Sequence, residues 1–190
     1  MKRTSLLCLS VLLLMLTGCS GDEEMVDDDD CVRGGIIYDG YTQQKTDEND
    51  PVAVFFAKEL HNPYWDGYGK EHKTFFEQGE WNDESCLMIN SRQEFQDAYM
   101  GTEELPGIDF NQYTLIVGRT WGEDGSYRLG KIVLRDMGLT YELETQLLRY
   151  HYENMGVTLA IRTIYYWRLY PKLDIKEIIP KRTVTDVYDN

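Results

Sequence analysis

Hydrophobic and polar residues alternate over much of the second half of the chain, which is the period of β-strands with one buried and one solvated face. Residues 141–146 show this pattern clearly, with Tyr, Leu and Thr on one parity and two Glu and a Gln on the other. Residues 112–121 are apolar on both parities around Ile116 and Val117. This denser pattern predicts a central strand that is covered on both faces.

Turn residues divide this β-rich region. Residues 122–125 read Gly-Glu-Asp-Gly and predict a hairpin turn, and residues 137–138 predict a second turn. Between them the apolar parity changes, because residues 127–129 and residues 132–134 place their large apolar side chains on opposite parities. One extra residue in a strand produces such a change, so we predict a β-bulge at Gly130.

Other apolar runs predict further strands in both halves of the chain. They cover residues 31–38, 52–57, 86–90, 157–170 up to Pro171, and 175–187 around Pro180. Residues 52–57 read Val-Ala-Val-Phe-Phe-Ala, and such a short run of β-branched and aromatic residues is typical of a buried strand. Residues 61–84 show no clean period, so we predict a long irregular connection there, of the kind that often carries function.

One main helix is predicted at about residues 91–100. Ser91 and Glu94 form a capping box, in which the serine oxygen accepts the backbone N–H of Glu94 and the carboxylate accepts a backbone N–H in return. Apolar residues follow at helical spacing, namely Phe95, Ala98 and Tyr99. Gly101 is expected to end the helix in the left-handed conformation. Together the elements predict a single α+β domain over residues 31–190, built on a strongly bent antiparallel β-sheet or half-barrel.

The N-terminus is predicted to be a signal peptide followed by a lipid anchor. Two basic residues precede an apolar run at residues 6–16 that is too short to span a bilayer, so residues 1–18 are excluded from the fold. The stretch Leu16-Thr17-Gly18-Cys19 resembles the lipobox of bacterial lipoproteins, in which the cysteine is lipidated and becomes the first residue. The resemblance implies attachment to a membrane through a lipid on Cys19.

An acidic segment at residues 19–30 follows the lipobox. Its self-repelling charges and low apolar content predict an extended, disordered tether. Acidic residues after a lipidated cysteine resemble the export signal of Bacteroidetes-type lipoproteins, which implies the outer face of the outer membrane. Gly21, Met25 and Val26 interrupt the acidic run and depart from that signal.

Charge and cysteine content narrow the classes of partner. The chain has 33 acidic and 19 basic residues and a net charge of −14, which argues against nucleic acid and anionic lipid surfaces as partners. With Cys8 in the signal peptide and Cys19 taken by lipid, Cys31 and Cys86 remain. A disulfide between them is permitted in an oxidising compartment, and two separate thiols are the alternative.

The sequence predicts a non-enzymatic protein without metal or cofactors. The three histidines lack a metal-binding spacing, and no nucleophile–base arrangement or cofactor motif is present. The long connection does contain a candidate surface for a ligand or partner, formed by His61, Tyr64, Trp65, Tyr68 and Trp81. Such side chains can anchor a protein partner or stack on sugar rings, and they can equally cap a hydrophobic core.

Several stretches together resemble the PrcB-like domain, a family of small exported lipoproteins named for a member that stabilises a surface protease complex. The stretches lie within residues 85–180 and are Ile89-Asn90-Ser91, Glu94-Phe95, Gly107-Ile108-Asp109-Phe110 and Tyr113-Thr114-Leu115-Ile116-Val117. Two places depart from the family's pattern, because Gly125-Ser126-Tyr127 stands where Gly-Gly-Tyr is frequent and Tyr170-Pro171-Lys172 replaces a Thr-Pro stretch. The resemblance implies an α+β domain that binds a protein partner, with no catalytic residues.

These observations lead to one expected function and one alternative. We expect a lipid-anchored protein of the cell envelope, exposed at the cell surface, that binds a protein partner or stabilises a surface complex. The alternative is a glycan-binding accessory lipoprotein that uses the aromatic residues of the long connection.

Overall fold

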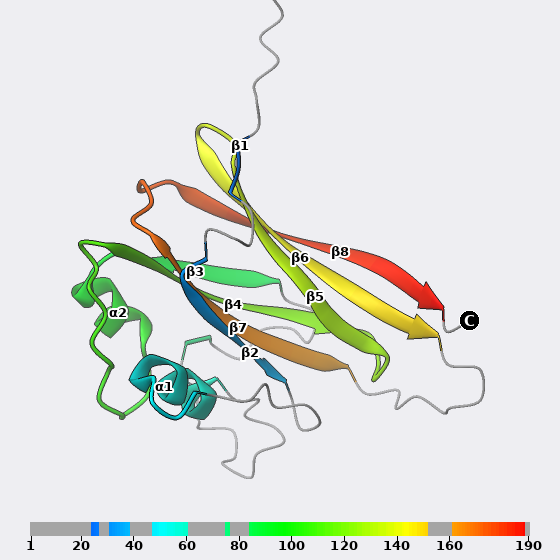
Figure 1. Cartoon of the computed structure of the whole chain (residues 1–190), viewed down its shortest axis with the longest axis horizontal. Coiled ribbons are helices and arrows are strands. Elements are labelled where there is room, and N and C mark those ends of the chain that lie inside the picture. Colours follow the sequence, from blue (N-terminus) through cyan, green and yellow to red (C-terminus); the bar gives the residue numbers. More distant parts are fainter. Residues whose placement is uncertain are drawn as a thin grey trace, which may run out of the picture.

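The computed structural model describes residues 24–26, 31–38, 47–60, 75–76, 84–151 and 161–188. Two helices and eight strands lie within them (Figure 1). In chain order they are β1 (Glu24–Val26), β2 (Arg33–Tyr38), α1 (Pro51–Glu59), β3 (Ser85–Ile89), α2 (Arg92–Ala98), β4 (Tyr113–Gly122), β5 (Tyr127–Asp136), β6 (Thr140–His151), β7 (Arg162–Pro171) and β8 (Glu177–Tyr188). The predicted signal peptide and the lipidation site at Cys19 lie outside the described residues, so both stay predictions.

The strands form two four-stranded sheets in place of the predicted single bent sheet or half-barrel. The central sheet has the order β2–β7–β4–β3, and the outer sheet has the order β1–β5–β6–β8. Neighbouring strands are antiparallel throughout the central sheet, whereas β8 runs parallel to β6 in the outer sheet. The α+β class is confirmed, but the wholly antiparallel arrangement is wrong, because the chain passes through β7 in the central sheet before β8 returns beside β6.

Two hydrophobic clusters show that the molecule has three layers. The first cluster packs the helices against one face of the central sheet, where the rings of Phe56 and Trp167 stack with centroids 5.0 Å apart. The second cluster lies between the two sheets. Val117 belongs to the first cluster and Ile116 to the second, so the strand predicted at residues 112–121 is confirmed as an interior strand covered on both faces.

The segment predicted to be a strand at residues 52–57 forms the helix α1 instead. The Asp50 side chain accepts the backbone N–H of Val52 at 2.9 Å, and Pro51 begins the helix. An aspartate cap followed by proline at the first helical position is a helix-start signal that outweighs the β propensity of the apolar run. The buried apolar residues recur at helical spacing, namely Val52, Phe55 and Phe56.

The serine cap of the helix predicted at about residues 91–100 is confirmed in α2, whereas the return hydrogen bond to Glu94 comes from Asn90, one residue before the N-cap. Ser91 Oγ accepts the backbone N–H of Glu94 at 3.1 Å. In return, Glu94 Oε2 accepts the backbone N–H of Asn90 at 2.6 Å. Phe95 is fully buried under the helix, as the apolar stripe predicted. The local sequence therefore specified the start of α2 and the face that it buries.

The end of α2 differs from the prediction. The helix stops at Ala98, and Tyr99 is extended because its hydroxyl donates a 2.7 Å hydrogen bond to the buried carboxylate of Glu59 on α1. Gly101 lies against the Tyr99 ring, where an added Cβ would collide with it, and among the described glycines only Gly138 has a positive φ. Gly101 is thus not a left-handed cap, and α2 is not the single main helix, because α1 is longer.

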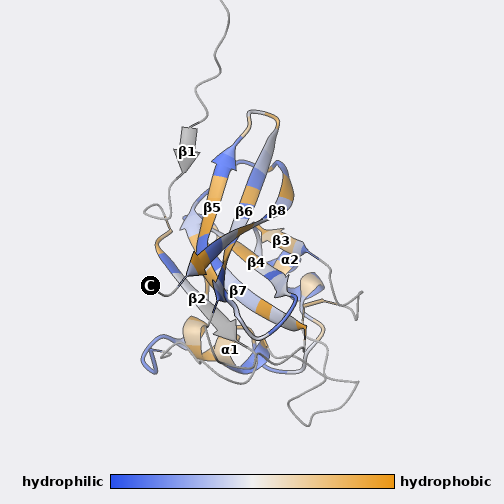
Figure 2. Ribbon diagram, turned by 90° about the vertical axis from the view of Figure 1, so that its right-hand side faces the viewer, coloured by the Kyte–Doolittle hydropathy of each residue, from blue (hydrophilic) through white to orange (hydrophobic). Residues whose placement is uncertain are grey.

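The bulge, the alternating burial and the turn predicted for β5 and β6 are confirmed. The register of β5 against β6 shifts between Leu129 and Lys131, which is the bulge predicted at Gly130. Burial alternates along β6, with Leu143 inside and its neighbours partly exposed. Figure 2 shows the same alternation of hydrophobic and hydrophilic residues along these strands. Gly138 adopts φ 84° in the turn between them, which confirms that turn.

The turn predicted at residues 122–125 does not close a hairpin. It connects β4 of the central sheet to β5 of the outer sheet, and β4 pairs with β3 and β7. A turn of this composition reverses the chain locally, but the pairing of the strands that it joins is decided by their packing on opposite sides of the second cluster. The hairpin prediction is therefore wrong.

Three residues of the segment predicted to be a disordered tether form the short strand β1. Glu24 to Val26 pair with the edge of β5, with Glu24 opposite Asp136. The edge of a sheet offers unpaired backbone groups that a passing segment can bind. Neither helix in the described part of the chain has the length and hydropathy of a membrane-spanning helix.

Candidate partner-binding cleft

The residues predicted to form an aromatic ligand surface lie outside the described part of the chain. They are His61, Tyr64, Trp65, Tyr68 and Trp81. Two aromatic residues of the same connection are described, and Phe75 is buried against Phe56 with ring centroids 5.7 Å apart. Phe76 packs at the edge of the same cluster, beneath the guanidinium of Arg119. This part of the connection therefore serves core packing.

Cys31 and Cys86 are two separate thiols in the structure. Cys31 lies two residues before the start of β2, and Cys86 lies in β3, at the opposite edge of the central sheet. Three strand spacings separate these edges, or about 14 Å, which is twice the Cα separation that a disulfide can bridge. Burial, reinforced by the charge of Glu84, raises the pKa of the Cys86 thiol to about 12. The disulfide alternative is thus not realised in this fold.

An open cleft of about 520 Å³ lies where three segments meet at one end of the central sheet. The segments are the start of α2, the loop before β4 and the residue that follows β7. Its lining residues are Asn90, Ser91, Arg92, Ile108, Asp109, Phe110, Asn111 and Lys172. Most of these residues belong to the stretches that resemble the PrcB-like domain, although the sequence did not show that they surround one cleft.

Lys172 holds the three segments together. Its ammonium group donates to the carbonyl of Asn90 at 2.7 Å and to the carbonyl of Phe110 at 2.8 Å. The Asn90 side chain accepts a 2.6 Å hydrogen bond from the hydroxyl of Thr114, so the floor of the cleft is fixed from β4 as well. Lys172 lies at least 61 residues along the chain from every other lining residue (172 − 111 = 61), and it reaches them because the fold returns the end of β7 beside β4.

The other wall of the cleft is built by short-range hydrogen bonds. Asp109 Oδ1 accepts the backbone N–H of Asn111 at 3.0 Å, which forms an Asx-turn before β4. The Arg92 guanidinium donates to the carbonyls of Pro106 and Leu105 at 2.7 and 3.1 Å. The turn and the guanidinium therefore fix the loop relative to the start of α2.

The cleft carries positive charge in an acidic protein. Lys172 and Arg92 bind carbonyl oxygens, and within the described residues no carboxylate forms an ion pair with either cation. Asp109 is the one acidic residue in the lining. The whole chain has a net charge of −14, whereas the cleft has two cationic side chains and one carboxylate and is therefore locally positive. Such a cleft favours a ligand that carries a carboxylate.

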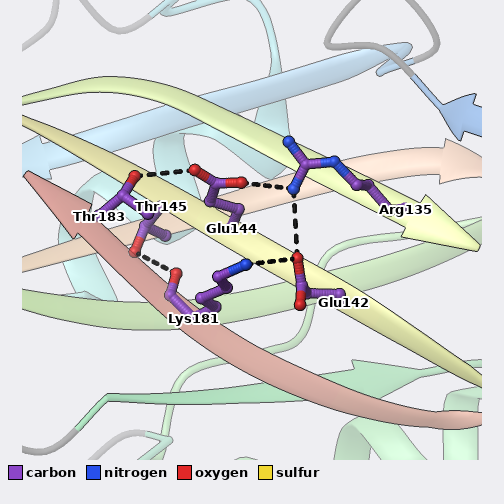
Figure 3. Close-up of polar contacts among 6 residues, drawn as sticks. All are labelled: Arg135, Glu142, Glu144, Thr145, Lys181 and Thr183. Atoms are coloured by element: carbon purple, nitrogen blue, oxygen red, sulfur yellow. Dashed lines mark hydrogen bonds and ion pairs between the residues drawn. The ribbon is translucent and has the colours of Figure 1, made fainter. Parts of the chain in front are cut away.

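Two glutamates on β6, Glu142 and Glu144, connect the strands of the outer sheet. Glu144 accepts hydrogen bonds from Arg135 and from Thr183, and Glu142 pairs with Arg135 and Lys181 (Figure 3). The hydrogen bond from Arg135 holds the pKa of Glu144 below its usual value. Since Arg135 lies on β5 and Lys181 and Thr183 lie on β8, these contacts join β5, β6 and β8 across the outer face.

Comparisons with protein-family models, with curated proteins and with solved structures found no match to this chain. Within the described residues no group of three His, Cys, Asp or Glu side chains converges to hold a metal ion.

Proposed function

We propose that this protein is a lipid-anchored component of the cell envelope that is displayed at the cell surface and binds a protein partner through the cleft at Lys172. The anchor is the lipid on Cys19 implied by the lipobox, and the PrcB-like resemblance supports the binding role. The observation that carries the proposal is the positively charged cleft, because the stretches that resemble a partner-binding family surround it.

The chemistry of the cleft supports a polypeptide as the ligand. Amide side chains of Asn90 and Asn111, a hydroxyl of Ser91 and two cations line an open surface with room for several side chains. Polar groups in this density match the backbone and side chains of a peptide segment, and a carboxylate of that segment would reach Lys172 or Arg92.

The binding role is tested by cross-linking on intact cells followed by mass spectrometry, and then by affinity measurements on the purified complex. Lys172→Met should weaken binding about tenfold, the effect of losing one charged contact of about 1.4 kcal/mol. Lys131→Met is the matched control, because Lys131 is exposed on the outer sheet and the substitution removes the same charge. Equal affinities for the two variants would refute the cleft as the binding site.

Two further measurements test the rest of the proposal. Cys19→Ala should release the protein from the membrane fraction, and protease added to intact cells should remove the domain if it is displayed at the surface. Specific binding to a glycan array that is lost in Trp65→Ala would favour the alternative function, glycan binding through the long connection.

A further inference from the structure

Three large apolar side chains are exposed together at one end of the outer sheet. Leu139 is 90% exposed, Ile175 is 84% exposed and Met137 is 44% exposed. Met137 and Leu139 belong to the turn between β5 and β6, and Ile175 lies just before β8. The next residue, Lys176, binds both carboxylate oxygens of Asp136, at 2.7 and 2.6 Å, and so holds Ile175 beside the turn. We call Met137, Leu139 and Ile175 the apolar tip.

Backbone contacts shape the turn that carries Met137 and Leu139. The N–H of Met137 donates to the carbonyl of Thr140 at 2.9 Å, and Gly138 supplies the positive φ that the tight turn needs. The fold therefore presents these side chains on a hydrogen-bonded turn and does not fold them back onto the core. Leaving a leucine and an isoleucine almost wholly in water is unfavourable, and neighbouring exposed apolar side chains mark a contact surface.

The strand β1 begins at the same end of the outer sheet as the apolar tip. Glu24 pairs with Asp136, which immediately precedes the apolar tip, and β1 runs antiparallel to β5, so β1 begins at the tip end of the sheet (Figure 1). Glu24 follows Cys19 by five residue steps (24 − 19 = 5). A chain of that length spans at most about 17 Å. A lipid on Cys19 would therefore hold the bilayer within about 17 Å of the place where the sheet ends in the apolar tip.

We propose that the apolar tip enters the interface of the lipid bilayer beside the lipid anchor. This inference rests on the anchor at Cys19 described under the proposed function, and it adds a second point of contact that fixes the orientation of the domain. The occupant is a membrane surface because the anchor brings one to this end of the molecule. The net charge of −14 favours zwitterionic over anionic lipids at that surface.

The test uses the full lipidated chain reconstituted in phosphatidylcholine vesicles. A maleimide derivative of the fluorophore NBD is attached to Leu139→Cys in a Cys31→Ser background, at pH 7, where the raised pKa of Cys86 keeps that thiol protonated. Tyr188→Cys is the matched control, because Tyr188 is 66% exposed at the far end of β8. Eleven residue steps, or about 36 Å, separate it from the start of that strand. Dithionite added to the outside reduces NBD that is in contact with water.

The expected result is that dithionite reduces the label at Leu139 several-fold more slowly than the label at Tyr188, and only when vesicles are present. Ile175→Cys should show the same protection, which guards against a local effect of one substitution. Equal rates at Leu139 and Tyr188 on vesicles would overturn the inference alone. Protection of Leu139 without vesicles, in a Cys19→Ala chain, would also overturn it, because a second copy would then cover the tip. Failure of the chain to float with the vesicles would overturn the anchor and the tip together.

Discussion

We expect that replacing Gly118 with alanine lowers the stability of the fold by a measurable amount. It lies in β4, directly opposite Tyr166 of β7, and the fully buried Tyr166 ring extends over it between the two sheets. A Cβ added at Gly118 would approach Cζ, Oη and Cε2 of Tyr166 far inside 3.0 Å, a separation that real Cβ atoms essentially never show. The ring cannot move away, because both sheets pack around it.

The cost of Gly118→Ala follows from this geometry. Overpacking a well-packed core costs about 1–3 kcal/mol, and three simultaneous collisions place this substitution near about 3 kcal/mol. For a domain of this size that loss lowers the melting temperature by roughly 6–12 °C. Urea unfolding followed by circular dichroism gives the change in free energy directly, provided that the slope against urea is unchanged.

A second substitution identifies the cause. Leucine has none of the three colliding atoms. In a Tyr166→Leu background, Gly118→Ala should therefore cost less than about 1 kcal/mol of stability. The difference from the cost in the wild type is a coupling energy of about 2 kcal/mol between the two positions. Gly107→Ala is the control, because nothing lies within 4 Å of its added Cβ, and it should change stability by less than about 0.5 kcal/mol. An undiminished cost of Gly118→Ala in the Tyr166→Leu background would refute the reasoning.

Three further predictions concern groups whose environment the fold has changed. Burial and the charge of Glu84 raise the pKa of Cys86 to about 12 from 9.0. Iodoacetamide at pH 8 should therefore alkylate Cys86 about 10³-fold more slowly in the native protein than in denaturant. Mass spectrometry of the peptide that contains Cys86 measures both rates, and comparable rates would contradict this prediction. The pKa of Glu144 is lowered by Arg135, so their interaction stabilises the fold above the usual glutamate pKa of 4.5 and is lost as the pH falls below it. The stability difference between the wild type and Arg135→Met should therefore shrink on acidification, and a constant difference would show that the interaction is not electrostatic. Ser91→Ala should cost about 1 kcal/mol through loss of the helix cap, whereas Ser91→Asp should be nearly neutral, and equal losses in thermal unfolding would argue against capping.

The local sequence predicted the structure correctly where interactions between residues close in sequence determine it. The serine cap of α2 could be predicted, because the hydrogen bond from the Glu94 N–H to Ser91 lies within one turn of helix. The bulge at Gly130 could be predicted, because a change of parity along one strand can arise only from an inserted residue. Residues 52–57 form a helix although their apolar run favours a strand, because the preceding Asp50-Pro51 pair starts the helix.

The sequence by itself determined which faces of the strands are apolar, where α2 starts and that the chain is strongly acidic, because these properties depend on neighbouring residues or on composition. Only the tertiary structure decided that β4 and β5 belong to different sheets, that β8 lies parallel to β6, and that Lys172 closes a cleft with residues from the start of α2 and the loop before β4. It also placed the exposed residues of the apolar tip beside β1. The reason is that strand pairing, and hydrogen bonds such as those of Lys172 to distant carbonyl groups, depend on how the sheets and helices pack together. A pattern within one segment carries no information about that packing.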